Sequence, residues 1–293
     1  MDSITHAFAA SLPLLAIGSV SLVPFAVLGA IVPDIDILFE VMPKNNPSDY
    51  IFIHGGITHS FAGVVGISIT AFIMIGGLSR LPVVQEKFPV CISYGIFFAI
   101  LGGAVLHIFL DYLAYPGIPL LYPFSTGKYT AGILHGPSLF LLIMSSIFLS
   151  LFILNKTDRA HIRIYLAIFV CFILFHAGLK LYVTLQTGGE AVPGINPLRW
   201  LIIQEDDSEY IILEYHLIHG VSDKKIFEKY INISAEEAGM YRNVPEIQRL
   251  RYHSYITTVE KDLSGITFRD PLRESRRIMY PRNYVRYCVN FSG

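Results

Sequence analysis

Four apolar segments, each long enough to cross a bilayer, constrain the fold of this chain more than any other feature. They cover roughly residues 61–79, 90–113, 133–154 and 162–184, and about 20 apolar residues in a helix span the ~30 Å hydrocarbon core. The stretch 4–32 is also apolar, but Gly18-Ser19 and Pro24 interrupt it. It can therefore form one long tilted helix or a hairpin of two short ones.

Charged residues divide the chain into two parts. Residues 1–189 hold 8 Lys/Arg and 8 Asp/Glu, whereas residues 190–293 hold 14 Lys/Arg and 15 Asp/Glu. An ordinary soluble domain has about 25% charged residues, so only the second part has a soluble composition. We predict a mainly α, polytopic membrane helical bundle over 1–189 and a small soluble α+β domain over 190–293.

The second part follows a linker rich in glycine and proline and has alternating and helical patterns of its own. These patterns predict strands at 200–204 and 210–217 around a turn at 205–208, helices at 223–230 and 235–250, and strands at 252–260, 265–269 and 284–290. No catalytic constellation stands out among these residues. The chemistry is therefore expected in the first part.

Bulk properties exclude several classes of protein. Three cysteines without a CxxC pair support neither a disulfide framework nor a thiolate metal site. A net charge of -1 gives no reason to expect nucleic acid as a partner. The chain is expected to be a multi-pass protein of the cell membrane.

Basic residues in the connections predict the orientation of the bundle. The connections at 80–89 and 155–163 carry five positive charges, and those at 33–60 and 114–132 carry only Lys44 and Lys128. By the positive-inside rule the first pair is cytoplasmic. The C-terminal domain then lies on the extracytoplasmic side.

Ionisable residues within or beside the apolar segments form a definite set. Such residues are costly in a membrane unless they are paired or bind a metal. His107 and Asp111 are four residues apart and so share one helix face; a metal or a simple hydrogen-bonded pair would explain them. Asp34 and Asp36 follow an apolar helix, where they can face a cation or merely end the helix.

Histidines complete this set. His54 and His59 flank Gly55-Gly56, and Thr58 and Ser60 can cap the next helix or hold a ligand histidine by its second nitrogen. With His6, near the start of the chain, the set has seven groups. Seven groups are more than one tetrahedral zinc site needs, so they suit a dinuclear centre or one metal with a general base and orienting carboxylates. They can converge only if residues 4–32 fold back near Gly18–Val23, because a single span would leave His6 on the opposite side. We therefore predict the hairpin.

The order of these motifs resembles the YdjM-like inner-membrane metal-dependent hydrolases. The motifs are Asp2-x-x-Thr5-His6, Pro33-Asp34-x-Asp36, His54-x-x-x-Thr58-His59-Ser60, His107-x-x-x-Asp111 and Tyr122-Pro123-Phe124-Ser125. The resemblance covers nearly the whole chain and implies a multi-pass membrane hydrolase with a bound divalent metal.

Two positions depart from the family pattern. Gly55 stands where family members usually have Arg; if that Arg orients a phosphate or a carboxylate, this chain must do so otherwise. His135-Gly136-Pro137 stands where they often have Asp-Pro. His135 can replace the aspartate as a ligand or hydrogen-bond partner, or it can be an interfacial histidine.

The sequence thus predicts a hydrolase that activates water with a divalent metal and cleaves an ester or phosphoester of a lipid or lipid-linked substrate. The histidine share favours Zn²⁺, as one or two ions, with Mn²⁺ and Mg²⁺ as alternatives. The expected ligands are His6, Asp34, His54, His59, His107 and Asp111.

Roles around the metal follow the same reasoning. Asp36 or Asp2 would be the general base or would orient a ligand, and Lys128, Tyr122 and His135 would contact the substrate. Two other functions use the same residues: a cation or proton transporter, or a scaffold in which the metal is structural.

Overall fold

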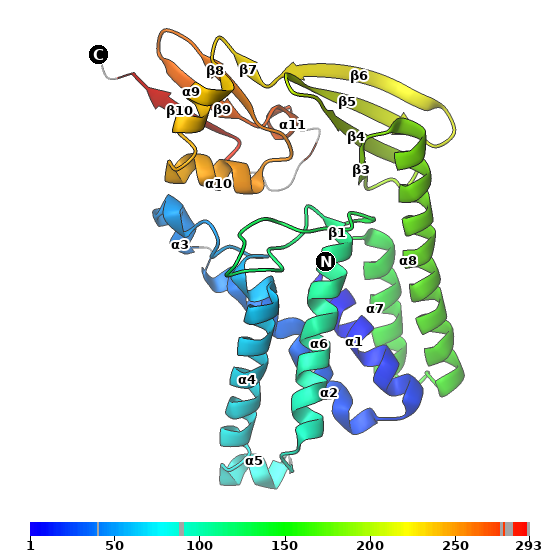
Figure 1. Ribbon diagram of the computed structural model, residues 1–293. Helices are drawn as coiled ribbons and strands as arrows, with labels where there is room; N and C mark the ends of the chain where they lie inside the picture. Colours follow the sequence, from blue (N-terminus) through cyan, green and yellow to red (C-terminus); the bar gives the residue numbers. More distant parts are fainter. Residues whose placement is uncertain (40, 88–90, 276–277, 279–283, 292–293) are drawn as a thin grey trace. The chain divides into compact units, whose positions relative to one another are not determined.

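The computed structural model describes residues 1–39, 41–87, 91–275, 278 and 284–291. The chain forms two compact units, one made of Met1–Leu38 and Ile53–Leu179 and the other of Phe39–Phe52 and Lys180–Gly293 (Figure 1). The first is a helical bundle and the second contains two β-sheets with short helices. The prediction of a mainly α membrane bundle with a small α+β domain is confirmed.

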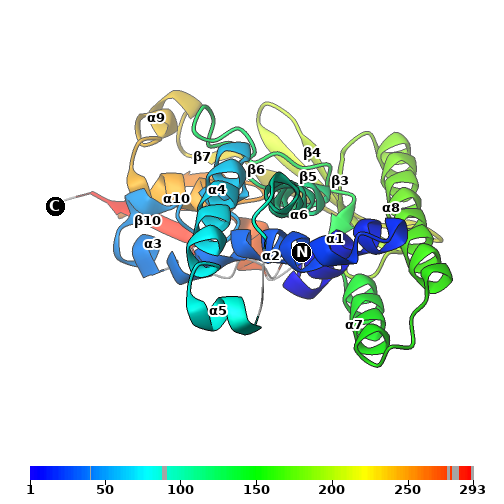
Figure 2. The same cartoon turned by 90° about the horizontal axis from the view of Figure 1, so that it is seen from below.

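The first unit is built from α-helices joined by short 3-10 helices and one small parallel strand pair. Viewed along the helices, α6 and the hairpin of α1 and α2 lie between α4 and the pair α7 and α8 (Figure 2). The helices are α1 (Ser3–Ile17), α2 (Val23–Ile31), α4 (Phe61–Leu78), α5 (Pro82–Lys87), α6 (Tyr94–Leu113), α7 (Leu139–Ile153) and α8 (Arg159–Thr187); the 3-10 helices are Val20–Leu22, Val32–Phe39 and Ile57–His59; the strands are β1 (Ala114–Tyr115) and β2 (Leu134–His135).

The predicted hairpin is present. Asp2 caps α1 by accepting from the backbone N–H of Thr5 at 2.8 Å, which satisfies a donor of the first turn. Gly18 ends the helix with φ 84°, a left-handed conformation that glycine adopts without strain. Helix α2 then returns and packs against α1.

Four helical stretches of the described residues are long and apolar enough to span a membrane: Val20–Phe39, Phe61–Leu78, Tyr94–Leu113 and Arg159–Thr187. The expected segment at 133–154 is shorter, because His135 lies in β2 and α7 begins only after Pro137 and Ser138. Its 15 residues extend about 22 Å. The expected start of the 90–113 segment falls outside the described residues, and its helix begins at Tyr94.

Small residues allow α2 and α6 to pack closely. A Cβ added at Gly29 would lie 1.9 Å from the carbonyl oxygen of Ile100, and one at Gly103 would lie 2.0 Å from that of Ala26. Ala30 is fully buried in the same contact. Membrane helices commonly associate through such small residues, which let their backbones approach.

The second unit contains two four-stranded sheets. In one, β3 (Glu190–Pro193), β4 (Arg199–Glu205), β5 (Glu209–His216) and β6 (Gly220–Glu228) are antiparallel neighbours in chain order. The other has the order β10-β9-β8-β7, and its core includes Ile247, Leu250 and Phe268. Its elements are β7 (Tyr230–Ile231), β8 (Thr258–Lys261), β9 (Gly265–Arg269) and β10 (Arg286–Asn290), with α9 (Ala235–Met240), α10 (Pro245–His253) and α11 (Pro271–Glu274) in the same unit, as are α3 (Val41–Asn45) and the 3-10 helix Pro47–Asp49.

Three details of the predicted second part are wrong. Residues 223–230 are not a helix: they lie mostly in β6, which pairs with β5 through a turn at Gly220 with φ 73°. Strand pairing overrides the helical propensity of this lysine-rich stretch. The predicted helix 235–250 is two helices, because the chain turns before Pro245, which begins α10. The predicted strand 252–260 starts only at Thr258.

Candidate metal centre

The predicted ligands meet at one end of the first unit. His6 lies on α1, Asp34 and Asp36 on the 3-10 helix after α2, His54 and His59 in the segment before α4, and His107 and Asp111 on α6. The structure gathers them into three overlapping groups, within each of which the donor atoms lie within 4.8 Å of one another. The groups are His6, His107 and Asp111; Asp34, His59 and His107; and Asp36, His54 and His59.

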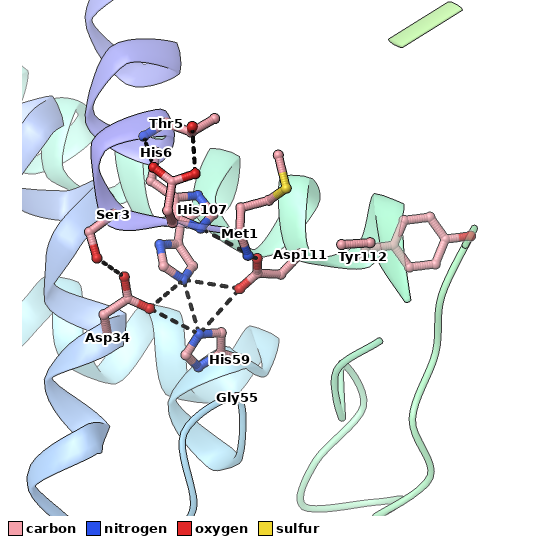
Figure 3. A network of polar contacts seen from close by, with 12 residues as sticks. Met1, Ser3, Thr5, His6, Asp34, Gly55, His59, His107, Asp111 and Tyr112 are labelled. Atoms are coloured by element: carbon pink, nitrogen blue, oxygen red, sulfur yellow. Dashed lines mark hydrogen bonds and ion pairs between the residues drawn. The ribbon is translucent and has the colours of Figure 1, made fainter. Parts of the chain in front are cut away.

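Four donor atoms, one each from Asp34, His59, His107 and Asp111, lie close together (Figure 3); we call them the four-donor cluster. Nε2 of His59 and Nε2 of His107 are 3.0 Å apart. Asp34 Oδ1 lies 3.6 and 3.4 Å from these two nitrogens, and Asp111 Oδ2 lies 3.3 Å from each. Donors at about 2.0–2.2 Å from a tetrahedral metal are about 3.3–3.6 Å apart. These five contacts are therefore short enough for neighbouring side chains of the cluster to bind the same metal ion.

The proton on His107 is fixed by a backbone contact. Its Nδ1 lies 2.6 Å from the carbonyl oxygen of Ala30, and because a carbonyl only accepts, Nδ1 must donate. In the neutral ring Nε2 then keeps its lone pair, and this atom is the one that contacts His59, Asp34 and Asp111. The close packing of α2 on α6 at Gly29 and Gly103 brings this carbonyl to the ring.

Asp36 orients His59 in the same way. Nδ1 of His59 lies 3.1 Å from Asp36 Oδ2, so it donates to the carboxylate and leaves Nε2 as a ligand atom. The backbone N–H of Gly55 donates to the same oxygen at 3.1 Å, and the Thr58 hydroxyl donates to it as well. A carboxylate that fixes the second nitrogen of a ligand histidine is the usual partner in metal sites.

His54 lies beside the four-donor cluster, in the group that it forms with Asp36 and His59. Its Nδ1 donates to Asp36 Oδ1 at 2.9 Å and lies 3.9 Å from Asp34 Oδ1. Its side chain is 30% exposed, whereas those of His59 and His107 are fully buried. His54 is thus the histidine of the centre that solvent can reach.

The two histidines of the segment before α4 bind protons more readily than usual. The hydrogen bond to Asp36 raises the pKa of His54, against the opposing effect of burial. Burial by itself would lower the pKa of His59, but its contacts with Asp111, Asp34 and Asp36 raise it well above its ordinary value. Both shifts express the strong negative field at the site, which attracts cations.

His6 and the second oxygen of Asp111 extend the centre. Nε2 of His6 lies 3.3 Å from Asp111 Oδ1, and its ring stacks on that of His107 with centroids 3.7 Å apart. The amino group of Met1 also contacts Asp111 Oδ1 (Figure 3). The two oxygens of Asp111 therefore have separate partners: Oδ1 contacts His6 and Met1, and Oδ2 contacts His59 and His107. A carboxylate in this position could bridge two cations or bind one cation with both oxygens.

The donor set fits a divalent metal. Both ring nitrogens of His6 and Oδ1 of Asp34 are buried without a hydrogen-bond partner among the described residues, and buried polar atoms rarely stay so. Carboxylates in an apolar bundle also need a counter-charge. A cation held by Asp34, His59, His107 and Asp111, with His6 as a further donor, would satisfy both requirements.

The remaining predicted residues have other surroundings. Both carboxylate oxygens of Asp2 are used by Thr5, through its backbone N–H and its hydroxyl, each at 2.8 Å. Asp2 therefore caps α1. Sequence reasoning missed Ser3, whose hydroxyl donates to Asp34 Oδ2 at 2.6 Å; its place within the first polar motif was the available signal.

The predicted substrate residues lie in or beside the loop that connects β1 to β2. Tyr122 and Lys128 are half-buried in this loop, and His135 lies half-buried in β2 opposite Tyr115. The loop returns to the end of α6 that carries Asp111: the N–H of Ala131 donates to the carbonyl of Tyr112 at 2.7 Å.

Gly55, which departs from the family pattern, has a local role. Its φ of 76° is a conformation that side chains rarely adopt. This turn directs its N–H toward Asp36. Ser60 next caps α4 by accepting from the N–H of Gly63 at 2.9 Å, as predicted.

The bundle matches a known family of membrane proteins. The model of the YdjM inner membrane protein family matches residues 1–182, which include every residue of the four-donor cluster. No curated protein and no solved structure matches the chain. Because the matched region is more than half of the sequence, the chain belongs to the YdjM inner membrane protein family.

Proposed function

We propose that the protein is a membrane-bound, metal-dependent hydrolase that cleaves an ester or phosphoester in a lipid or lipid-linked substrate. The close approach of buried His59 and His107 to each other and to the carboxylates of Asp34 and Asp111 is the single observation that carries the proposal. Mixed imidazole and carboxylate donors suit Zn²⁺ best, with Mn²⁺ and Mg²⁺ as alternatives. A metal held there supplies Lewis-acid activation of water.

His54 is our candidate for proton transfer. Asp36 fixes its ring through Nδ1 at 2.9 Å, so that Nε2 can exchange protons at the accessible side of the centre. A histidine held by a buried carboxylate is a common arrangement for general acid–base catalysis. Asp36, which the sequence offers as a general base or an orienting group, then acts through His54 and His59 by positioning both.

Water needs a place among these donors. Four protein ligands fill a tetrahedral zinc site, whereas a catalytic site keeps one position for water or substrate. A catalytic ion would therefore be held by fewer than four of these donors, or by more than four ligands in all, so that a water molecule could bind beside them. His6 and the second oxygen of Asp111 also leave one or two ions as alternatives, which the metal content distinguishes.

A lipid substrate is supported by the surface next to the carboxylates. On the 3-10 helix Val32–Phe39, Asp36 is buried and Asp34 half-buried, whereas Ile35, Ile37 and Leu38 are exposed. The same short helix thus presents carboxylates inward and apolar side chains outward. A lipid could reach the centre laterally, and Lys128, Tyr122 and His135 would hold its headgroup.

The test begins with metal analysis of the protein purified in detergent. We expect bound Zn²⁺, and metal-dependent turnover of phospholipids or lipid phosphates that is lost in His107→Ala. Asp158→Asn, at an exposed pair with His161, is the matched control and should retain both. Absence of metal in the wild type, or turnover that survives His107→Ala, would overturn the proposal. Cation flux in liposomes without hydrolysis would favour a transporter.

We further propose that the centre and the C-terminal domain lie on the extracytoplasmic side. The support is the excess of basic residues in the connections at 80–89 and 155–163. Single cysteines at Lys156 and Lys128 should react with a membrane-impermeant reagent from opposite sides of the membrane. Reversed accessibility would contradict this orientation.

A further inference from the structure

One end of the sheet β3-β4-β5-β6 carries two neighbouring loops. The loop 194–199 joins β3 to β4, and the turn 216–220 joins β5 to β6. The N–H of Leu217 donates to the carbonyl of Leu198 at 3.0 Å, which ties the two together. We call residues 194–199 and 216–220 the loop pair.

The loop pair exposes large apolar side chains. Ile195 is 76% exposed and Ile218 is 71% exposed, and Leu198, whose carbonyl accepts from Leu217, is 39% exposed. Single exposed apolar residues are common on soluble proteins. Several on adjacent loop tips, together with exposed Arg199 and no acidic residue in either loop, are typical of a surface that contacts lipid.

The exposure of these tips follows from ordered backbone. Within the first loop the N–H of Leu198 donates to Asn196 Oδ1 at 2.9 Å, and the indole N–H of Trp200 donates to the carbonyl of Pro197 at 3.0 Å. In the second, the N–H of Ile218 donates to His216 Nδ1 at 3.2 Å. The isoleucines are therefore presented outward by a defined conformation.

The loop pair is attached to the end of a membrane-spanning helix. The last turns of α8, from Lys180, belong to the same compact unit as the sheet. The side chains of Tyr182 and Tyr215 contact each other, and Gln204 Nε2 donates to the carbonyl of Thr187 at 2.6 Å. Because Tyr215 directly precedes the turn 216–220, the loop pair lies near the turn of α8 that carries Tyr182.

The turn of α8 that carries Tyr182 is expected at the membrane interface. Helix α8 has 29 residues and is about 43 Å long, which exceeds the ~30 Å hydrocarbon core. Between Arg163 and Lys180 it has no charged residue and one histidine, His176, and Tyr182 follows Lys180. Lysine and tyrosine near the end of a span characteristically lie among the lipid headgroups.

The opposite end of the same sheet provides a contrast. The turn between β4 and β5 contains Glu205, Asp206 and Asp207, and the seven residues of β4 separate it from the loop pair by about 23 Å. An acidic turn is repelled by anionic lipid, whereas an apolar tip beside Arg199 is attracted. The sheet is thus polarised in the direction that a membrane surface would select.

We propose that the loop pair is a membrane-contacting surface that inserts Ile195 and Ile218 at the boundary between headgroups and acyl chains of the bilayer spanned by α8. Arg199 faces the anionic headgroups. The partner is a lipid surface, and the inference does not depend on hydrolysis or on a bound metal.

The test uses the full chain in nanodiscs of phosphatidylcholine and phosphatidylglycerol. In a background with Cys91, Cys171 and Cys288 replaced by serine, an environment-sensitive fluorophore is attached at Ile218→Cys, Ile195→Cys or, as matched control, Asp207→Cys. Doxyl-labelled lipids should quench the label at 218 and at 195 several-fold more than the label at 207. Aqueous acrylamide should show the reverse order.

Other outcomes are equally decisive. If acrylamide reaches 218 and 195 as readily as 207, the loops lie in water and the proposal is wrong. If neither quencher reaches them, protein covers the tips, for instance a second copy of the chain, and the proposal is also wrong. The fluorescence of Trp200, the single tryptophan, reports in each variant whether the sheet is folded.

Discussion

The two units of the molecule use their charged groups in opposite ways. In the bundle, His6, His59, His107 and Asp111 are buried and lie within contact distance of one another. In the second unit, which has more charges, ion pairs such as Lys229–Glu205 and Lys261–Glu237 involve partly or largely exposed side chains. The unit with fewer charged residues thus has its ionisable side chains more deeply buried and in closer mutual contact.

This difference shows that the amount of charge does not locate a site. A surface pair in water contributes about 0–1 kcal/mol, whereas each buried group in the bundle needs a partner to be tolerated at all. Substitutions should therefore have large, shared effects in the centre and small, independent effects in the second unit. The predictions below test this difference between the two units.

Loss of a ligand should have the largest effect. His107→Ala removes Nε2 from two of the three donor groups, so metal affinity should fall by more than the ~100-fold that loss of an outer partner can cost. Isothermal titration with Zn²⁺ in detergent measures the change. His161→Ala, at the exposed pair with Asp158, should leave the affinity unchanged, and equal losses in both variants would contradict the assignment.

Loss of an orienting group should have a smaller effect on the same property. Asp36→Asn keeps the shape of the side chain but weakens its acceptance from His59 and His54. Metal affinity should fall about 10–100-fold, as for other second partners of ligand histidines. An Asp36→Asn loss as large as that of His107→Ala would instead indicate that Asp36 binds the metal directly.

Close helix packing should matter next. Gly103→Ala places a Cβ 2.0 Å from the carbonyl oxygen of Ala26, whereas nothing lies within 4 Å of a Cβ at Gly102. Overpacking costs about 1–3 kcal/mol, and the forced separation of α2 from α6 should also move the Ala30 carbonyl away from His107. We expect Gly103→Ala to lower thermal stability and metal affinity together. Gly102→Ala should change neither.

The same contrast explains what the sequence could predict. His107 and Asp111 are four residues apart, and the need to bring His6 to them requires the hairpin, so helical periodicity and ligand chemistry sufficed for both. The orienting carbonyl of Ala30 has no side-chain signal, because it depends on the approach of α2 to α6 at Gly29 and Gly103. The hydrogen bond of His54 to Asp36 and its partial exposure likewise depend on tertiary contacts that the local sequence does not contain.

The second unit was harder to predict because its elements are short and defined by pairing. Residues 223–230 have the composition of an exposed helix. In the structure, however, every residue of β6 pairs with a residue of β5 except Ser222, near which the register shifts. Such a choice depends on tertiary contacts that local propensity does not contain. The membrane bundle, with long apolar helices, leaves fewer alternatives open.

One buried group of the second unit should behave more like the centre. Asp270 is fully buried, and its carboxylate accepts from the N–H groups of Tyr255, Leu272 and Arg273. Asp270→Ala should lower the free energy of unfolding by about 1–2 kcal/mol, as loss of a helix cap does. Burial raises the pKa of Asp270, so Asp270→Asn, which stays neutral and keeps one acceptor, should cost less. Denaturant unfolding followed by Trp200 fluorescence measures both.

The smallest effect is expected at the surface of the same unit. Glu205 pairs with Lys229 at 2.7 Å, but its side chain is 63% exposed, so water and salt screen the interaction. Glu205→Gln should lower the free energy of unfolding by less than about 1 kcal/mol, and the difference should shrink further in high salt. The same Trp200 measurement applies. A loss of unfolding free energy as large as that of Asp270→Ala would contradict this expectation, because an exposed ion pair would then stabilise the unit as much as a buried carboxylate does.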